Sequence, residues 1–129
     1  MFAEHAGANE LPCLGIAEVA DLTGISAFTI RYYDRCGFFP GLARDRRGVR
    51  SFSHADVAQL RFVDALRKSG LSIEGIQYYV RLQRRGIASS DERLPIVRAQ
   101  EAALECQVSG LEECLKRLRS AEAGLLSAN

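Results

Sequence analysis

The sequence has little of what marks a large core or a catalytic centre. It contains no Trp, one Met, two His and three Pro among 129 residues. A chain of this length fits one domain, or a small domain with an appendage, and the absence of Trp favours a small helical core. His5 and His54 have no nucleophile or carboxylate partner evident in the sequence, and neither a phosphate-binding glycine loop nor a cluster of metal ligands is present. We therefore predict no enzyme, no catalytic residue, no metal and no cofactor.

Long apolar runs and a signal-peptide pattern are also missing, so we predict a cytoplasmic protein without a membrane partner. In that compartment the four cysteines, Cys13, Cys36, Cys106 and Cys114, are expected to be reduced thiols and not a disulfide framework. Residues 1–13 show little periodicity, and we interpret them as a flexible leader without an assigned function.

The run Ile16–Arg35 has the pattern of two short helices around a tight turn. Apolar residues recur at helical spacings on both sides of Thr23-Gly24-Ile25-Ser26. Gly24 suits a left-handed turn because it has no Cβ, and Ser26 can cap the second helix. That helix offers donors for phosphates and base edges on a rigid support, as a helix in the DNA major groove must; the candidates are Thr29, Arg31, Tyr32 and Tyr33. The same pattern also occurs in helical cores that bind no DNA, so that alternative stays open.

The net charge of +1 hides an uneven distribution. Residues 1–90 hold 12 Lys and Arg against 9 Asp and Glu, whereas residues 91–129 hold 5 against 7. Residues 31–50 alone contain six arginines and two aspartates. The basic charge thus lies beside the predicted helix pair, where a phosphate-binding surface belongs.

A β-hairpin, or wing, is predicted between Gly41 and Phe52. The turn Asp45-Arg46-Arg47-Gly48 separates short apolar-containing flanks. Arginines at and near its tip are candidates for contacts to phosphates or the minor groove: Arg44, Arg46, Arg47 and Arg50. A solvated charged loop is the alternative.

Two further helices are expected after the wing, capped by Ser53 with Asp56 and by Ser72. Phe38 and Phe39, which precede the wing, are expected in the core. The last turn of the first of these helices carries Arg67 and Lys68. These cations either favour the helix dipole or contact the DNA backbone.

The final segment, residues 89–129, has a heptad pattern. Ser89 and Glu92 resemble a capping box, but Pro95 suggests that regular helix begins near it or is kinked there. The apolar seam consists of Val97, Leu104, Val108, Leu111, Leu115, Leu118 and Leu125. A helix from about Ile96 to Leu126 would be about 46 Å long at ~1.5 Å per residue. It is too long for the small domain to cover, so we predict pairing with a second copy of the chain. Docking on a different protein is the alternative.

Several of these motifs, in this order, resemble the MerR family of bacterial transcription regulators. The resemblance covers roughly residues 14–125 through Thr23-Gly-Ile-Ser, Thr29-Ile-Arg-Tyr-Tyr-Asp34, Gly37-Phe-Phe-Pro40, Gly48-Val-Arg-Ser-Phe52 and Leu66-Arg-Lys-Ser-Gly-Leu-Ser-Ile73. It implies a mainly all-α fold in which a winged helix-turn-helix domain, residues 14–86, precedes a dimerisation helix, residues 89–129, that pairs antiparallel. It also implies contacts to the DNA backbone from the wing and from the corner at Arg67 and Lys68. Where the family usually has an aromatic pair after the wing arginine, this chain has Ser51-Phe52.

The resemblance implies a sequence-specific regulator that binds promoter DNA as a homodimer on the bacterial nucleoid. By distorting the DNA it would help RNA polymerase to engage the promoter, under the control of an unidentified effector. Two alternatives remain: a constitutive repressor or architectural protein, and a coiled-coil interaction module. Tyr78 and Tyr79 are candidates for the lining of an effector pocket, with a place in the core as the alternative for both.

The cysteines give little support for a sensor. Metal-sensing members of the family carry a cysteine-bearing loop after the dimerisation helix, and we expect no such loop here. Cys106 and Cys114 lie about 12 Å apart along one helix at ~1.5 Å per residue, so they cannot share a metal within one subunit. Short members that sense aldehydes or oxidants use a cysteine at the position of Ala65. Cys36, near Arg31 and Arg35, remains a candidate redox thiol, with an inert packed residue as the alternative.

Overall fold

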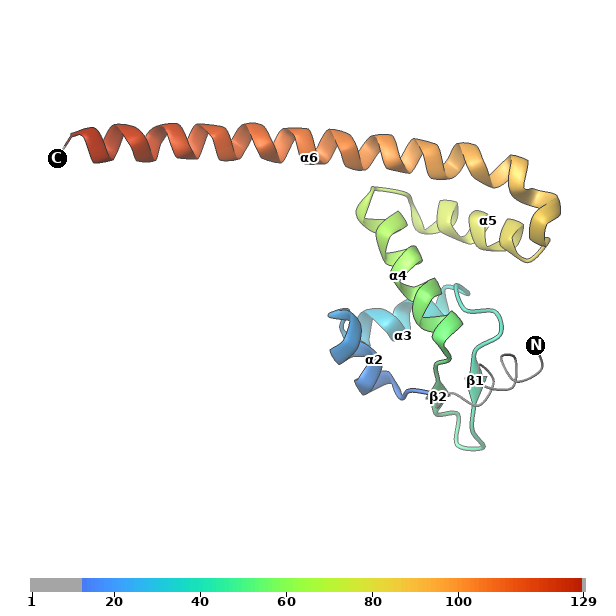
Figure 1. Cartoon of the computed structure of the whole chain (residues 1–129). Coiled ribbons are helices and arrows are strands. Elements are labelled where there is room, and N and C mark those ends of the chain that lie inside the picture. The colour runs from blue at the N-terminus through green and yellow to red at the C-terminus, as the bar shows by residue number, and fades with distance from the viewer. Residues whose placement is uncertain (1–12, 129) are drawn as a thin grey trace, which may run out of the picture.

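The computed structural model describes residues 13–128 as a mainly helical chain with one small hairpin (Figure 1). The helices are α2 (Ile16–Thr23), α3 (Ala27–Arg35), α4 (His54–Lys68), α5 (Ile73–Gln83) and α6 (Ser90–Ser127), with a short 3₁₀ helix, η1 (Gly86–Ser89). Strands β1 (Ala43–Arg44) and β2 (Arg50–Ser51) pair antiparallel. The predicted mainly helical fold with a hairpin and a long C-terminal helix is confirmed. Apart from Cys13, the predicted leader lies outside the described residues.

The core lies where α2, α3, α4 and α5 meet the segment around the hairpin. Val19, Ile30, Phe38, Phe52 and Leu60 are completely buried, and burying a side chain of this size stabilises a fold by about 1.5–3 kcal/mol. Residues 38 and 39 are both in the core, as predicted. The aromatic side chains before and after the hairpin therefore fix it to the helices.

Three predicted helix starts are confirmed by their capping hydrogen bonds. The hydroxyl oxygens of Ser26, Ser53 and Ser72 accept from the backbone N–H three residues on, at 3.1, 3.2 and 3.0 Å. Asp56 completes the capping box by accepting from the Ser53 N–H at 2.9 Å. Gly24 ends α2 with a φ of 75°, a left-handed conformation that suits glycine. Gly24 and Ser26 together define the turn that joins α2 and α3.

The capping box predicted at the start of α6 is wrong. The Ser89 hydroxyl is fully buried and donates to the Leu82 carbonyl oxygen at 2.5 Å, and it accepts from Arg93 Nε at 2.8 Å. Glu92 instead pairs with Arg85 at 2.8 Å. The side chains that would cap α6 thus tie it to α5 and η1. Helix also begins before Pro95, which stands inside α6.

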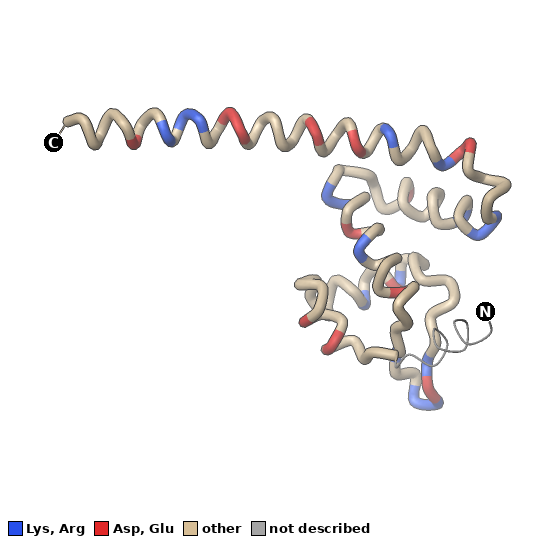
Figure 2. Tube along the Cα trace, in the orientation of Figure 1, with Lys and Arg blue, Asp and Glu red and all other residues tan. Residues whose placement is uncertain are grey.

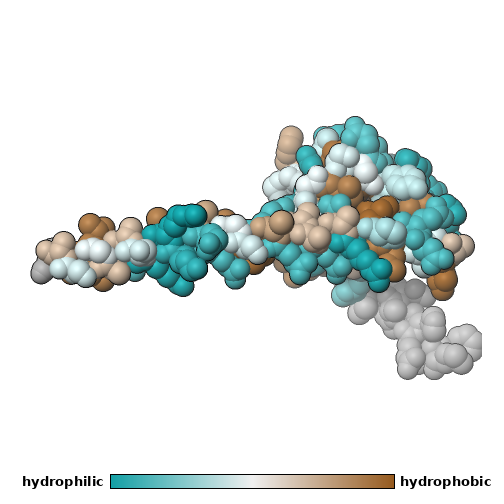
Figure 3. Space-filling view, turned by 90° about the horizontal axis from the view of Figure 1, so that it is seen from above, coloured by the Kyte–Doolittle hydropathy of each residue, from teal (hydrophilic) through white to brown (hydrophobic). Residues whose placement is uncertain are grey.

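The long helix α6 has two different halves. Near its start, Ile96 and Val97 pack on the core, and Gln100 accepts from the Ser69 hydroxyl at 2.8 Å. Farther along, Gln107 donates to the Lys68 carbonyl at 3.2 Å. From residue 105 every described residue is exposed, and this half projects from the globular part as a rod (Figure 3). None of the helices in residues 13–128 combines the length and apolarity needed to cross a membrane.

Candidate nucleic-acid interface

The turn between α2 and α3 is held by side-chain hydrogen bonds within a few residues. The Thr23 hydroxyl donates to the Val19 carbonyl at 2.8 Å and accepts from the Ile25 N–H at 3.2 Å. Ser26 then starts α3, and its hydroxyl also donates to Thr29 Oγ1 at 3.0 Å. The turn therefore orients α3 while keeping Thr29 half-buried and hydrogen-bonded at its base.

One face of α3 is exposed and carries Phe28, Arg31, Tyr32 and Arg35. These positions are separated by steps of three, one and three residues, so they form one stripe along the helix. All four are exposed, and the Arg35 guanidinium carbon lies 5.9 Å from the centre of the Tyr32 ring. We call this set the α3 stripe. It presents two cations and two aromatic rings on a short helix whose opposite face is buried.

Tyr33 does not belong to the α3 stripe, although the sequence placed it among the DNA contacts. Its side chain is buried beside Phe38, with ring centres 5.5 Å apart, and its hydroxyl donates to Asp64 at 3.3 Å. Burial, with the nearby Asp64 carboxylate, raises the pKa of Tyr33. Its position on the inner side of α3 assigns Tyr33 to the core.

The base of the hairpin is fastened to α3 by Asp34. Its carboxylate accepts from Arg44 of β1 at 2.5 Å and from Arg50 of β2 at 2.6 Å. The Asp34 side chain is only 6% exposed, against 43% for Arg44 and 21% for Arg50. These two arginines, predicted to be DNA contacts, are engaged in an ion-pair cluster that sets the distance between hairpin and helix.

The tip of the hairpin carries arginines, which are the blue segments there in Figure 2. Arg46 is exposed, and the Arg47 side chain is 83% exposed with a long, 3.4 Å contact to Asp45. Asp45 accepts from the N–H groups of Val49 and Arg47 at 2.9 and 2.8 Å. The hydrogen bond from Val49, with the one from Arg47, holds the pKa of Asp45 below its ordinary value. The ionised carboxylate thus shapes the turn that displays both arginines.

The end of α4 carries Arg67 and Lys68, both exposed as expected for candidate backbone contacts. Lys68 pairs with Asp64 at 2.8 Å, and Arg67 donates to the Leu71 carbonyl at 3.0 Å. Asp64 therefore links this corner to α3 through Tyr33.

Cys36 is half-buried at the end of α3. Its hydrogen bond with the Tyr32 hydroxyl is the main cause of the raised pKa of Tyr32. The Cys36 carbonyl accepts from Gln77 of α5 at 2.9 Å, and the adjoining hollow is also lined by Arg81 and Arg84. This contact joins α5 to the interface.

Of the two tyrosines considered for an effector pocket, Tyr78 is 46% exposed and Tyr79 is buried.

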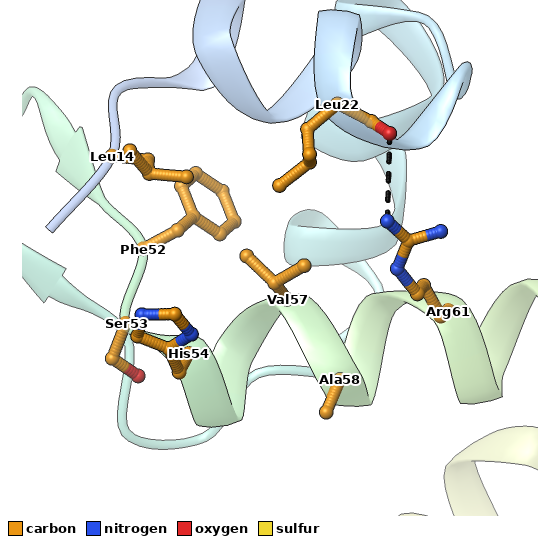
Figure 4. Close-up of a pocket in the computed structure, with 8 residues that line it drawn as sticks. All are labelled: Leu14, Leu22, Phe52, Ser53, His54, Val57, Ala58 and Arg61. Carbon is orange, nitrogen blue, oxygen red and sulfur yellow. Dashed lines mark hydrogen bonds between the residues drawn. The ribbon is translucent and has the colours of Figure 1, made fainter. Parts of the chain in front are cut away.

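A hollow of about 440 Å³ lies between α2, β2 and the start of α4 (Figure 4). Leu14, Leu22, Phe52 and Val57 supply most of its apolar lining, and Arg61 donates to the Leu22 carbonyl at 3.4 Å. This mainly apolar hollow is unlike the cationic and aromatic α3 stripe and the arginine-bearing hairpin tip, so it is not part of the candidate interface.

In residues 13–128 no three His, Cys, Asp or Glu side chains are grouped so that they could hold a metal ion.

The predicted seam of α6 is mostly exposed. Val97 and Leu104 are half-buried, whereas Val108, Leu111, Leu115, Leu118 and Leu125 are between 46% and 71% exposed. Cys106 and Cys114 are exposed as well. The apolar seam thus continues beyond the part of α6 that its own domain covers.

Sequence reasoning missed two features of this interface. The role of Asp34 depends on arginines 10 and 16 residues away, although an acidic residue between Arg31 and Arg35 was a usable signal. Phe28 fits the apolar helical spacing of the run Ile16–Arg35, which by itself indicates a core residue, but it is 74% exposed. The exposure of Phe28 became clear only when the inner face of α3 was known.

The comparison with protein families matches residues 14–83 to the family described as MerR HTH family regulatory protein. Among curated proteins, an uncharacterized HTH-type transcriptional regulator from Haemophilus influenzae is 32% identical over 102 residues, which are 79% of this chain and 76% of that protein. The HTH-type transcriptional regulator AdhR from Bacillus subtilis is 34% identical over 84 residues, 65% of this chain and 60% of AdhR.

A solved structure has a closely similar backbone. It is HiNmlR, described as a MerR family regulator lacking the sensor domain, bound to promoter DNA. Its TM-score is 0.73 at 31% sequence identity, and the match covers 86% of this chain and 88% of that chain. The matched length includes both the helix-turn-helix and part of the long helix, since 86% of the chain exceeds the part that precedes α6.

Proposed function

Because the chain belongs to the MerR family of helix-turn-helix transcription regulators, we propose that two copies of it bind one promoter together and distort its DNA to control transcription initiation. The observation that carries the proposal is the exposed α3 stripe, on a helix to which Asp34 fastens the base of the arginine-bearing hairpin. A rigid helix with cations, flanked by a basic wing, fits a major groove and the phosphates beside it.

We assign the DNA contacts from the exposure of each side chain. Arg31 and Tyr32 contact base edges or phosphates from α3, with Thr29 at the helix start. From the hairpin tip, Arg46 and Arg47 reach the backbone or the minor groove, while Arg44 and Arg50 act mainly by fixing the wing through Asp34. Arg67 and Lys68 add backbone contacts from the end of α4.

We further propose that residues 89–129 form the dimerisation element and residues 14–86 the DNA-binding domain. We take the pairing of the two helices to be antiparallel, as the resemblance to the family implies. In the register in which Val108 faces the partner's Leu111, Leu104 faces the partner's Leu115, so the middle of the seam pairs apolar side chains with apolar side chains. This register gives a two-fold axis between Val108 and Leu111 and presents two copies of α3 to a pseudo-palindromic site.

Distortion of the promoter DNA is the step by which the protein would help RNA polymerase to engage the promoter. Bending and untwisting the spacer between promoter elements costs free energy that depends on the spacer sequence, which adds specificity at bases the protein does not touch. Such a regulator acts in the bacterial cytoplasm, on the nucleoid. An effector would change its footprint on DNA. A constitutive repressor or architectural protein, which the similarity to a regulator lacking the sensor domain also fits, would leave the footprint unchanged.

Arg31→Ala tests the proposal against a role as a coiled-coil interaction module. The variant is expected to bind promoter DNA roughly tenfold more weakly, because it loses one charged contact in each half-site, and to remain dimeric in sedimentation. Arg117→Ala, at an exposed position of α6 away from the seam, is the matched control and should bind normally. DNA affinity that is absent in the unmodified protein, or equal in both variants, would contradict the proposed interface.

A further inference from the structure

Phe28 stands out on α3 because it is large, apolar and 74% exposed. The buried residues of this helix are Ile30 and Tyr33, so Phe28 contributes little to the core. Intrinsic helix propensity does not favour it either, since Phe is a weaker helix former than Ala. Its exposure indicates a role outside the folded domain.

The position of Phe28 directs it toward DNA in the proposed complex. It is the second residue of α3 and lies on the α3 stripe, three residues before Arg31 and four before Tyr32. In helix-turn-helix proteins the first residues of the recognition helix contact the base edges. A ring at this position therefore meets bases, whereas Arg35, two turns later, is placed for the backbone.

The chemistry of the groove limits what a phenyl ring can recognise. Base edges in the major groove present hydrogen-bond donors and acceptors, with one apolar group, the C5-methyl of thymine. A ring pressed against guanine or cytosine would cover polar groups without offering them a partner, which is unfavourable. Contact with a methyl group removes apolar surface from water on both sides.

We propose that Phe28 is a specificity-determining residue that packs its ring on the C5-methyl group of a thymine in each half-site. This inference rests on the proposed function, because it requires α3 to enter the major groove. It adds a definite base preference at the position that faces the start of α3.

The test begins with duplexes that the full-length protein selects from a random-sequence library. In a selected duplex, each thymine in turn is replaced by deoxyuridine, symmetrically in both half-sites, which removes only the methyl group. At one position the unmodified protein should lose about fourfold in affinity per half-site, the change expected for one methyl contact. The other positions should show smaller effects.

Three variants assign that effect. Phe28→Ala should bind the thymine duplex roughly tenfold more weakly and no longer distinguish thymine from deoxyuridine, whereas Phe28→Leu should keep part of the preference. Ile87→Ala, which removes a 90% exposed apolar side chain of η1, is the control and should behave like the unmodified protein. Thermal unfolding of Phe28→Ala should be unchanged, because its ring is outside the core.

The outcomes separate this inference from the function on which it rests. Methyl dependence that is present in the unmodified protein and lost in Phe28→Ala supports the assignment. A selected duplex without thymine opposite α3, no methyl dependence, or methyl dependence that persists in Phe28→Ala overturns it and leaves the regulator proposal standing. Failure to select any duplex overturns both.

Discussion

Asp34 is the residue of α3 that fixes the position of the hairpin at the candidate interface. It is an acidic group on a helix that we propose to lie against phosphates, where its charge is unfavourable. Its carboxylate nevertheless joins α3 to both strands of the hairpin through Arg44 and Arg50. We infer that correct placement of the wing outweighs the repulsion between Asp34 and the DNA.

Asp34→Asn separates the two effects. Loss of the charged hydrogen bonds, worth about 1–3 kcal/mol for a group of this kind, should loosen the hairpin and weaken DNA binding roughly tenfold. The measurement is a binding isotherm at fixed salt, with Asp91→Asn, at an exposed position of α6, as the control. Tighter binding by Asp34→Asn would mean that its charge, and not its positioning of the wing, dominates.

Tyr33 gives the fold a dependence on alkaline pH. Its pKa in the folded protein is raised above the ordinary value of 10.0, first by burial and then by Asp64. A group whose pKa is higher in the folded state contributes stability below its unfolded pKa and loses that contribution as the pH rises through the folded pKa. The free energy of unfolding should therefore fall above about pH 10.

Urea unfolding between pH 8 and pH 11 measures this effect. Tyr33→Phe should show a smaller decline than the unmodified protein, and Tyr78→Phe, which alters an exposed tyrosine, should decline normally. An identical decline in the Tyr33→Phe variant would show that other groups cause it.

At the scale of elements, the structure separates what is encoded locally from what is not. The caps at Ser26, Ser53 and Ser72 depend on atoms within three residues, so the sequence predicts them. Ser89 has the same local pattern, but the Leu82 carbonyl and Arg93 compete for its hydroxyl. A cap can be predicted only where no tertiary partner competes with it.

The rotation of α3 about its axis was beyond sequence analysis for a related reason. Phe28, Ile30, Tyr32 and Tyr33 are apolar or aromatic and occupy both sides of a nine-residue helix. Either side could have faced the core until the packing of α4 and α5 was known. For this reason the sequence did not reveal that Tyr33 lies on the buried side of α3, whereas Arg31 and Tyr32 are exposed, as a contact with DNA requires.

For α6, the central seam predicts how the element assembles. Leu111→Glu places a charge next to the proposed two-fold axis, so its two copies should raise the dissociation constant of the dimer roughly a hundredfold. Cys106→Glu introduces the same side chain on the face opposite the seam and should leave dimerisation intact. Sedimentation equilibrium distinguishes the two, and a dimer unaffected by Leu111→Glu would exclude this seam as the interface.

At the scale of the whole molecule, the proposed function depends on combining one small domain with one long helix. The 38 residues of α6 span about 57 Å at ~1.5 Å per residue, enough to hold two domains apart on one duplex. The charge distribution along the sequence reflects the same division, because residues 1–90 have an excess of basic residues and residues 91–129 an excess of acidic residues. An overall charge of +1 conceals a basic surface confined to one part of the chain.

The most direct measurement is the affinity of the purified protein for DNA from upstream of its own gene, compared with a scrambled duplex over a salt series. Our account predicts tighter binding to the upstream DNA, with log K falling against log salt at a slope of roughly −5 to −7, as expected when about six to eight phosphates are neutralised. Equal, weak binding to both duplexes would contradict specific recognition of this promoter. Absence of binding to either duplex at low salt would contradict the assignment of the α3 stripe and the hairpin tip as a DNA-binding surface.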